Sequence, residues 1–307
     1  MSVTTTTNKV ITCVPGRWRL MHIITGLYTG GAEMMLYKLL KCIDRRKFET
    51  SVVSLISGGS MCDRIRSIGI TVESLNMRPG LPSLSALLNL RKLVRTKQPD
   101  LIQGWMDHGN LAAYVSRFYS VGSPPVVWNV RHSLSDIKNE PPLNRWIIRV
   151  NALWSSRVHA VIYNSRTGAN HHEAHGYDRA KTCVIPNGFD TQLFRPENQF
   201  RADIRRELGV SDDTLLIGLI GRYHLVKDHR TFIQAASILC KEIPDVRFLF
   251  AGREVNAGNA ALQGMIDTEG KGIGDRVFLL GERKDIPQLT AALDIATSSS
   301  AWGEGFS

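Results

Sequence analysis

The sequence predicts an α/β protein of two domains, each built on a parallel, doubly wound sheet. Short apolar runs of strand length alternate with helical segments along the chain. Strands separated by helix-length segments form parallel sheets, because each connection must cross back over the sheet. The alternation breaks once, near Asn187, and then restarts. At 307 residues the chain is also too long for one ordinary core, which favours two domains.

Seven apolar runs mark the strands of the first domain. Between most of them, apolar residues recur with the helical period, as in residues 32–42 and 84–96, so these connections are predicted to be helices. The predicted strands are residues 20–25, 50–55, 71–75, 100–105, 126–131, 160–164 and 182–185.

The alternation is interrupted by a turn at Pro186-Asn187-Gly188 and by a predicted linker over residues 195–200. We expect a tail over residues 1–18, a first domain over 19–189 and a second domain over 190–307. In the second domain, the predicted strands are residues 215–220, 246–251, 277–280 and 295–297, and the predicted helices are residues 228–241, 260–269 and 286–293.

Composition indicates a globular protein of a reducing compartment. Hydrophobic residues make up 43% of the chain and charged residues 21%. The five cysteines are scattered without a Cys-x-x-Cys spacing, which argues against a disulfide framework or a zinc site. The threonine-rich start lacks a signal-peptide core, and no apolar run reaches the roughly 20 residues that span a bilayer. These features predict a cytoplasmic location.

Net charge differs strongly between the two halves. Residues 1–186 hold 24 Lys and Arg against 11 Asp and Glu, whereas residues 187–307 hold 14 against 17. A basic half can meet nucleic acid, an anionic membrane or a phosphorylated acceptor, or it can be a solvated surface without a partner. No nucleic-acid-binding signature is present, so no nucleic-acid partner is predicted. We favour an anionic acceptor or membrane surface, which would place the protein at the inner face of the cytoplasmic membrane.

Residues suited to phosphate binding follow two predicted strands. Gly30 and Gly31 lie between a strand and a helix, where backbone N–H groups can approach an anion, although a glycine pair is often only a turn. Arg222 and Lys227 follow the strand at residues 215–220 and are predicted to lie on either side of the next helix start. A guanidinium and an ammonium there can hold a diphosphate and stabilise the charge of a departing one.

The last residues of the chain have the same character. Serines follow the last predicted strand and lead to Glu304-Gly305-Phe306-Ser307, a turn that exposes backbone N–H groups and a carboxylate. A helix that starts there would suit phosphate or sugar hydroxyl groups. We expect the chain to be a C-terminally truncated fragment whose second domain is incomplete.

Five of the nine histidines form two groups of interest. His108 and His132 each follow a predicted strand, which is a position for catalysis or substrate contact. His171 and His175 have the i, i+4 spacing of two helical metal ligands, but the residues between them do not form His-Glu-x-x-His. We interpret the cluster of His171, His172 and His175 as a solvated helix face and predict no metal site.

Eight short motifs follow one another along the chain. They are Gly-Gly-Ala-Glu at 30–33, Trp-Met-Asp-His-Gly-Asn at 105–110, Ile-Pro-Asn-Gly-Phe-Asp at 185–190, Gly221-Arg222 with Lys227-Asp228, Ala251-Gly252, Leu280-Gly281, Asp294 and Glu-Gly-Phe-Ser at 304–307. In this order they resemble the retaining glycosyltransferases of family 4. The resemblance implies the GT-B fold of two facing Rossmann-like domains and transfer of a sugar from a nucleotide diphosphate-sugar with retained anomeric configuration. It also implies no essential metal or other cofactor, and a role in cell-surface polysaccharide biosynthesis.

The resemblance further implies four catalytic residues. His108 would lie near the transferred sugar. Arg222 and Lys227 would bind the donor diphosphate. Glu304 would be the first glutamate of the family's paired-glutamate motif.

Other residues would bind donor or acceptor. The 190–307 domain would bind the nucleotide-sugar, and the 19–189 domain would receive a saccharide or a lipid-linked acceptor. The expected donor contacts are Gly30, Gly31, Gly305, Phe306 and Ser307. The expected acceptor or sugar contacts are Arg131, His132 and Asn187.

Two other functions remain open. A nucleotide-sugar 2-epimerase uses the same two-domain architecture, but the glutamate-containing loop and the Asn-Gly turn disfavour it. A non-catalytic subunit that binds a sugar nucleotide is disfavoured by the intact Arg222, Lys227 and Glu304.

Overall fold

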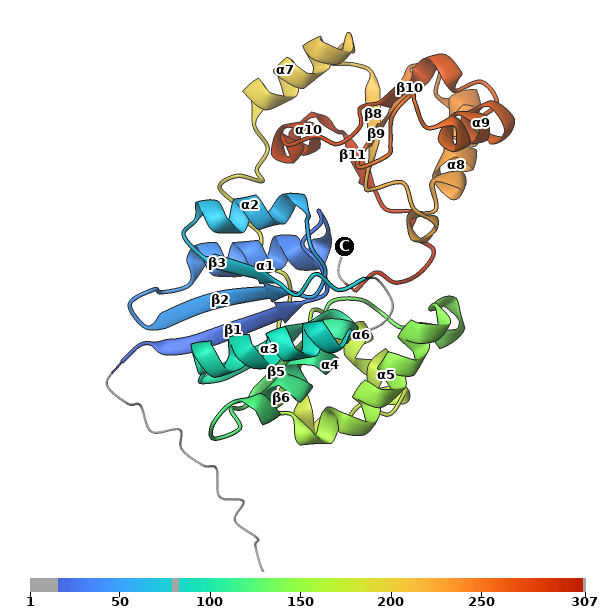
Figure 1. The fold of residues 1–307 in the computed structure, drawn as a ribbon. Coiled ribbons are helices and arrows are strands. Elements are labelled where there is room, and N and C mark those ends of the chain that lie inside the picture. Colours follow the sequence, from blue (N-terminus) through green and yellow to red (C-terminus); the bar gives the residue numbers. More distant parts are fainter. Residues whose placement is uncertain (1–15, 79–82, 306–307) are drawn as a thin grey trace, which may run out of the picture. The chain divides into compact units, whose positions relative to one another are not determined.

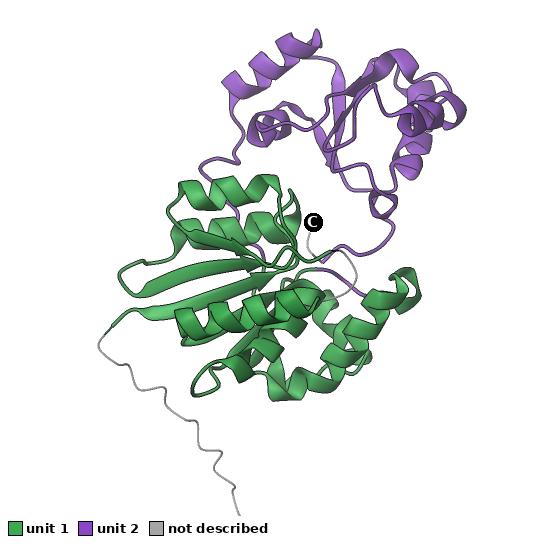
Figure 2. Cartoon of the chain, viewed as in Figure 1, with its two compact units in different colours: residues 1–131, 136–186 green, residues 132–135, 187–307 purple. Residues whose placement is uncertain are grey.

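The computed structural model describes residues 16–78 and 83–305 and divides into two compact units (Figure 2). Unit 1 comprises Met1–Arg131 and Asp136–Pro186, and unit 2 comprises His132–Ser135 and Asn187–Ser307. Each unit contains one parallel sheet with helices, so the predicted α/β class is confirmed. Two predicted donor contacts, Phe306 and Ser307, and most of the predicted tail lie outside the described residues.

Unit 1 is built on a seven-stranded sheet of order β3-β2-β1-β4-β5-β6-β7, in which neighbouring strands are parallel. Its strands are β1 (Trp18–Ile24), β2 (Phe48–Ser54), β3 (Thr71–Ser74), β4 (Leu101–Trp105), β5 (Val126–Val130), β6 (Ala160–Tyr163) and β7 (Thr182–Val184). Its helices are α1 (Gly31–Cys42), α2 (Ser60–Ser67), α3 (Leu84–Lys97), α4 (Met106–Ser116), α5 (Pro142–Trp154) and α6 (Arg166–Ala174).

Helices cover both faces of this sheet. Figure 1 shows α1 and α2 on one face and α3, α4 and α5 on the other. Neighbouring residues of a strand point to opposite faces, so a strand covered on both sides buries consecutive residues, most of which are apolar. Ile23 and Ile24 of β1 are accordingly both 0% exposed. This explains why the strand signals are continuous apolar runs rather than alternating patterns.

Unit 2 has a four-stranded parallel sheet of order β10-β9-β8-β11. On β9, Phe248 packs with Phe232 of α8, whereas the next residue, Leu249, packs with Ile204 of α7 and Leu289 of α10. This sheet is therefore also covered on both faces. Its strands are β8 (Leu215–Ile220), β9 (Val246–Ala251), β10 (Val277–Leu279) and β11 (Ile295–Thr297), and its helices are α7 (Asn198–Leu208), α8 (His229–Glu242), α9 (Ala260–Glu269) and α10 (Ile286–Ala292).

One predicted segment is wrong. The linker expected over residues 195–200 ends early, because α7 begins at Asn198. Phe200, Ile204 and Leu208 recur every four residues and mark one helical face, but the many charged residues between them hide this pattern. Within the described residues, no helix is both long and apolar enough to cross a membrane.

Candidate functional site

The sheet of unit 2 has its topological switch point between β8 and β11. From β8 the chain builds β9 and β10 on one side, and it returns on the other side as β11. Ligands of open α/β sheets bind beyond the carboxyl ends of the strands at such a point. The loop after β8 carries Arg222 and Lys227, and the loop after β11 carries Glu304. The topology therefore brings these three predicted residues to one edge of one sheet.

The loop after β8 is fixed by backbone contacts. The Gly221 N–H donates to Ala251 O at 2.8 Å, and the Tyr223 N–H donates to Arg253 O at 2.9 Å. Gly252 has φ 154°, and a Cβ at this position would lie 2.2 Å from Gly221 O. Only glycine fits such a close approach of two backbones, so the loop has a defined shape.

Lys227 and Glu304 form a hydrogen-bonded ion pair through Nζ and Oε1, although they lie 77 residues apart in the sequence. The Ser300 hydroxyl donates to the same carboxylate oxygen at 2.7 Å. The Ser299 hydroxyl donates to Lys227 O at 2.8 Å and fixes the backbone of the lysine. The Lys227 and Glu304 side chains are 29% and 28% exposed, so a ligand can reach them.

The prediction that Arg222 and Lys227 lie on either side of a helix start is wrong. Both residues precede α8, which begins at His229. Arg222 lies just after β8 and is exposed, and Lys227 ends a 3₁₀ turn over Leu225–Lys227. Asp228 caps α8, since its carboxylate accepts hydrogen bonds from the backbone N–H and hydroxyl of Thr231 at 3.2 and 2.7 Å. This carboxylate occupies the helix end. The capped helix N-terminus therefore offers an anion less than the side chains of Arg222 and Lys227 do.

Unit 1 has its own switch point, between β1 and β4. After β1 the chain reaches Gly30 and Gly31 at the start of α1, and β4 leads to His108 in the first turn of α4. A Cβ on Gly31 would meet no described heavy atom within 4 Å, so its backbone is accessible. A Cβ on Gly30 would lie 2.4 Å from a carboxylate oxygen of Glu33. The structure thus places the predicted glycines and histidine at the same edge of unit 1.

His108 is half-buried and has no hydrogen-bond partner among the described residues. Burial lowers the pKa of its imidazole below the ordinary value, and the charge of Asp107 opposes part of this shift. The ring is therefore neutral at pH 7 and can either donate or accept a hydrogen bond. The Arg131 guanidinium lies 5.7 Å from the centre of the Trp105 ring. Its Nη1 donates to Asn129 Oδ1 at 3.3 Å, which holds the side chain at the end of β5.

The two other predicted contact residues belong to unit 2. His132 forms an isolated antiparallel bridge with Glu304, and the neighbouring Ser133 N–H donates to Gly303 O at 3.2 Å. His132 therefore lies beside one of the predicted catalytic residues. Asn187 begins the second segment of unit 2 and is half-buried.

The interpretation of the histidine cluster as a solvated helix face is wrong for one member. His172 is 0% exposed, and its ring centre lies 5.4 Å from that of Tyr163. His171 and His175 are half-buried. A ring nitrogen of His172 and a carboxylate oxygen of Asp107 lie within 4.8 Å of each other. Within this cluster, the histidine that lies near the Asp107 carboxylate is therefore the buried His172, and not a member of the i, i+4 pair His171 and His175.

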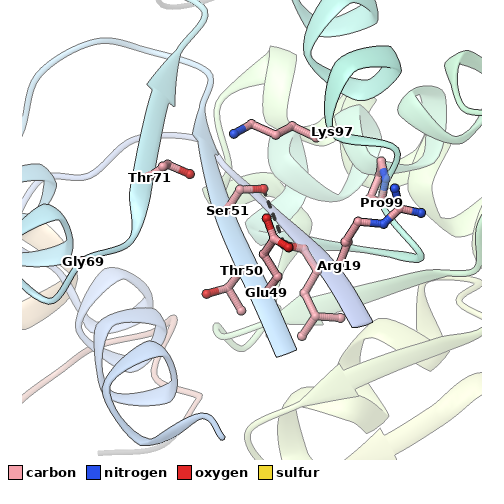
Figure 3. Close-up of a pocket in the computed structure, with 9 residues that line it drawn as sticks. Arg19, Glu49, Thr50, Ser51, Gly69, Thr71, Lys97 and Pro99 are labelled. Carbon is pink, nitrogen blue, oxygen red and sulfur yellow. Dashed lines mark hydrogen bonds between the residues drawn. The ribbon is translucent and has the colours of Figure 1, made fainter. Parts of the chain in front are cut away.

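A pocket of about 180 Å³ in unit 1 lies at the opposite edge of the sheet, near the amino ends of β1, β2 and β3 (Figure 3). Parallel sheets bind their ligands at the carboxyl ends, so this pocket is not the predicted site. Its lining residues are Arg19, Leu20, Glu49, Thr50, Ser51, Gly69, Thr71, Lys97 and Pro99.

Three residues of the unit 2 site were noted in the sequence, but their contacts were not predicted. Ser299 and Ser300 hold Lys227 and Glu304, and Gly252 shapes the loop after β8. The run of serines directly after an apolar strand was the available signal, since short hydroxyl side chains at a strand end commonly bind neighbouring loops.

Family models match both halves of the chain. Residues 29–193, more than half of the chain, match Glycosyltransferase Family 4, and residues 200–307 match Glycosyl transferases group 1. The putative glycosyltransferase EpsF of Bacillus subtilis (strain 168) is 23% identical over 92% of this chain and 73% of its own. The UDP-Gal:alpha-D-GlcNAc-diphosphoundecaprenol alpha-1,3-galactosyltransferase of Escherichia coli is 22% identical over 92% of this chain and 74% of its own.

Solved structures show the same relationship. Anabaena HepE in complex with UDP and glucose matches with a TM-score of 0.78 and 25% identity, over 94% of this chain and 76% of that one. A putative UDP-N-acetylglucosamine 2-epimerase from Listeria monocytogenes has a TM-score of 0.58 and 14% identity, over 93% and 75%, and shares the fold alone. The fold is thus GT-B, as expected. The chain is a glycosyltransferase and belongs to glycosyltransferase family 4.

Proposed function

We propose that this glycosyltransferase moves a sugar from a uridine diphosphate sugar to a saccharide or lipid-linked acceptor and retains the anomeric configuration. The observation that carries the proposal is the Lys227–Glu304 pair at the switch point of unit 2, with Arg222 in the same loop. Two relatives support the choice of nucleotide, since the E. coli protein is named for UDP-Gal and HepE was solved with UDP and glucose.

The two cations match the chemistry of the donor. When the bond from the anomeric carbon to the diphosphate oxygen breaks, negative charge grows on the leaving diphosphate. Lys227 and Arg222 would stabilise that charge from a loop that is already ordered, so little reorganisation is needed during the reaction. Glu304 Oε1 is an anionic acceptor for the Lys227 ammonium, as a phosphate oxygen would be. We therefore propose that the donor diphosphate takes over the Lys227 ammonium from Glu304.

Orientation of the sugar would complete the reaction. In the proposal, Glu304 and His108 hold the sugar so that the acceptor hydroxyl bonds to the anomeric carbon on the face that the diphosphate leaves. The acceptor proton passes to the departing diphosphate oxygen, which balances charge without a covalent enzyme intermediate. Residues 19–189 would receive the acceptor through Arg131, with His132 and Asn187 near the sugar, and residues 190–307 would hold the donor. Catalysis would rest on positioning and electrostatics.

We further propose that the basic first half of the chain binds anionic lipids at the inner face of the cytoplasmic membrane. Helix α3 supports this, because Leu84 and Leu88 are 73% and 55% exposed one turn apart. Its next turns expose Arg91, Lys92 and Arg95, and its sequence has no acidic residue. Binding to vesicles should require acidic lipid and weaken with salt, because charges are screened beyond about 8 Å at 0.15 M. Equal binding to neutral vesicles would contradict this part of the proposal.

A donor panel tests the function. The active protein is incubated with UDP-, GDP- and ADP-sugars, with and without an acceptor, and both products and anomeric configuration are followed by NMR. The proposal predicts transfer from a UDP-sugar with retained configuration. An altered sugar formed from donor alone would favour the 2-epimerase, and binding of UDP-sugar without turnover would favour a non-catalytic subunit.

A further inference from the structure

The turn that carries His108 has an unfavourable backbone. Strand β4 ends at Trp105 and α4 begins at Met106, so no loop residue separates strand from helix. Met106 has φ 62°, a left-handed conformation that is unfavourable for a residue with a β-carbon. Such a conformation persists only where its surroundings hold it, and it is concentrated at functional sites.

Backbone packing holds this turn against the sheet. A Cβ on Gly109 would lie 2.6 Å from Ile23 O of β1. A Cβ on Gly104 would lie 2.5 Å from the Cα of Asn110. The first turn of α4 therefore rests directly on β1 and β4, with two glycines making the approach feasible.

Asn151 of α5 makes a further contact with the turn. It is 0% exposed, and its Nδ2 donates to Asp107 O, the carbonyl just before His108, at 3.0 Å. The neighbouring buried positions of α5 are apolar, among them Ile148 and Ala152. A leucine at position 151 would avoid the cost of burying an amide, so helix packing alone does not explain the asparagine.

We infer that Asn151 is a positioning residue that holds His108 in the orientation needed for sugar transfer. The inference rests on the proposed function, since it gives His108 its role. The amide holds the carbonyl that precedes His108, in a turn whose Met106 backbone is unfavourable and needs such support. Release of the contact lets the turn relax and shifts the imidazole. A displacement near 1 Å at a reacting centre typically costs about 100-fold in rate.

The test compares Asn151→Leu with Asn144→Leu. Asn144 lies on the same helix and its Nδ2 donates to Glu140 Oε2 at 3.2 Å, so the control loses an amide hydrogen bond without touching the His108 turn. Asn151→Ala removes the same donor with a smaller side chain and guards against misfolding of the leucine variant. The measurements are kcat, donor KM, thermal unfolding and the NMR titration of His108, assigned with His108→Gln.

We expect both Asn151 variants to lower kcat about 10- to 100-fold with donor KM within about threefold, while Asn144→Leu stays near wild type. The pKa of His108 should rise toward its ordinary value, because a relaxed turn admits water. Equal kcat losses in the Asn151 and Asn144 variants, or an unchanged His108 titration, would overturn the inference. If the wild-type protein transfers no sugar, the proposed function fails, and the His108 titration alone decides whether Asn151 positions the turn.

Discussion

Replacing Glu304 by glutamine should tighten the binding of UDP and slow the transfer of sugar. The carboxylate holds the Lys227 ammonium, and a diphosphate must compete for that cation. Glutamine keeps an oxygen for the Ser300 hydroxyl, which donates to Glu304 at 2.7 Å in the wild type, but it removes the competing charge. The substitution therefore separates binding of the diphosphate from orientation of the sugar.

The size of the effect follows from exposure. Two unit charges in contact interact by about 4 kcal/mol at an effective dielectric constant of 20. Because the two side chains are 29% and 28% exposed, solvent screens the pair, and about 1–2 kcal/mol is a better figure. UDP should thus bind about 5- to 30-fold more tightly by calorimetry. Glu269→Gln, which breaks a pair with Arg230 at 3.7 Å in the same unit, should leave UDP binding unchanged. Weaker binding of UDP to Glu304→Gln would refute the competition.

Further predictions concern stability and metal dependence. Arg205→Ala should lower the free energy of unfolding of unit 2 by about 3 kcal/mol in urea, because Arg205 is 1% exposed and binds Asp294 at 2.5 Å. Arg206→Ala, at a 73% exposed side chain, should cost under about 0.5 kcal/mol. Burial lowers the pKa of His22 to about 4 from 6.5, so the unfolded chain binds the extra proton. Unfolding of unit 1 should therefore become easier by up to about 3 kcal/mol as pH falls from 6.5 to 4, and His22→Gln should flatten this dependence. Addition of EDTA should not change turnover, and neither should the substitution His171→Ala. If each of them abolishes activity, the enzyme depends on a metal ion.

Much of the fold could be predicted because buried parallel strands have a strong sequence signal. Every predicted strand is present, and β8, β9 and β11 have the predicted ends. Helix α7 was missed because only three apolar side chains mark its buried face. The burial of His172 could not be predicted, since three polar neighbours surround it and only the packing of α6 decides which side chain points inward.

The residues of the site were easier to predict than their contacts. Their position after strand ends indicated Arg222, Lys227 and Glu304, but not that two of them pair. That contact depends on strand order, because β11 pairs with β8 although β9 and β10 lie between them in the sequence. The role of Asp228 as the N-cap of α8 also could not be predicted from the spacing of residues in the sequence. Its carboxylate caps α8 by accepting a hydrogen bond from the Thr231 N–H.

The central claim is that unit 2 binds and activates a nucleoside diphosphate-sugar through Arg222 and Lys227. It is tested most directly by the turnover of Arg222→Ala and Lys227→Ala with the UDP-sugar that the wild-type protein uses, with folding checked by circular dichroism. Each cation is assigned to charge that develops on the leaving diphosphate, so each variant should lose about 100- to 1,000-fold in kcat while remaining folded. Folded variants with wild-type kcat would contradict the account.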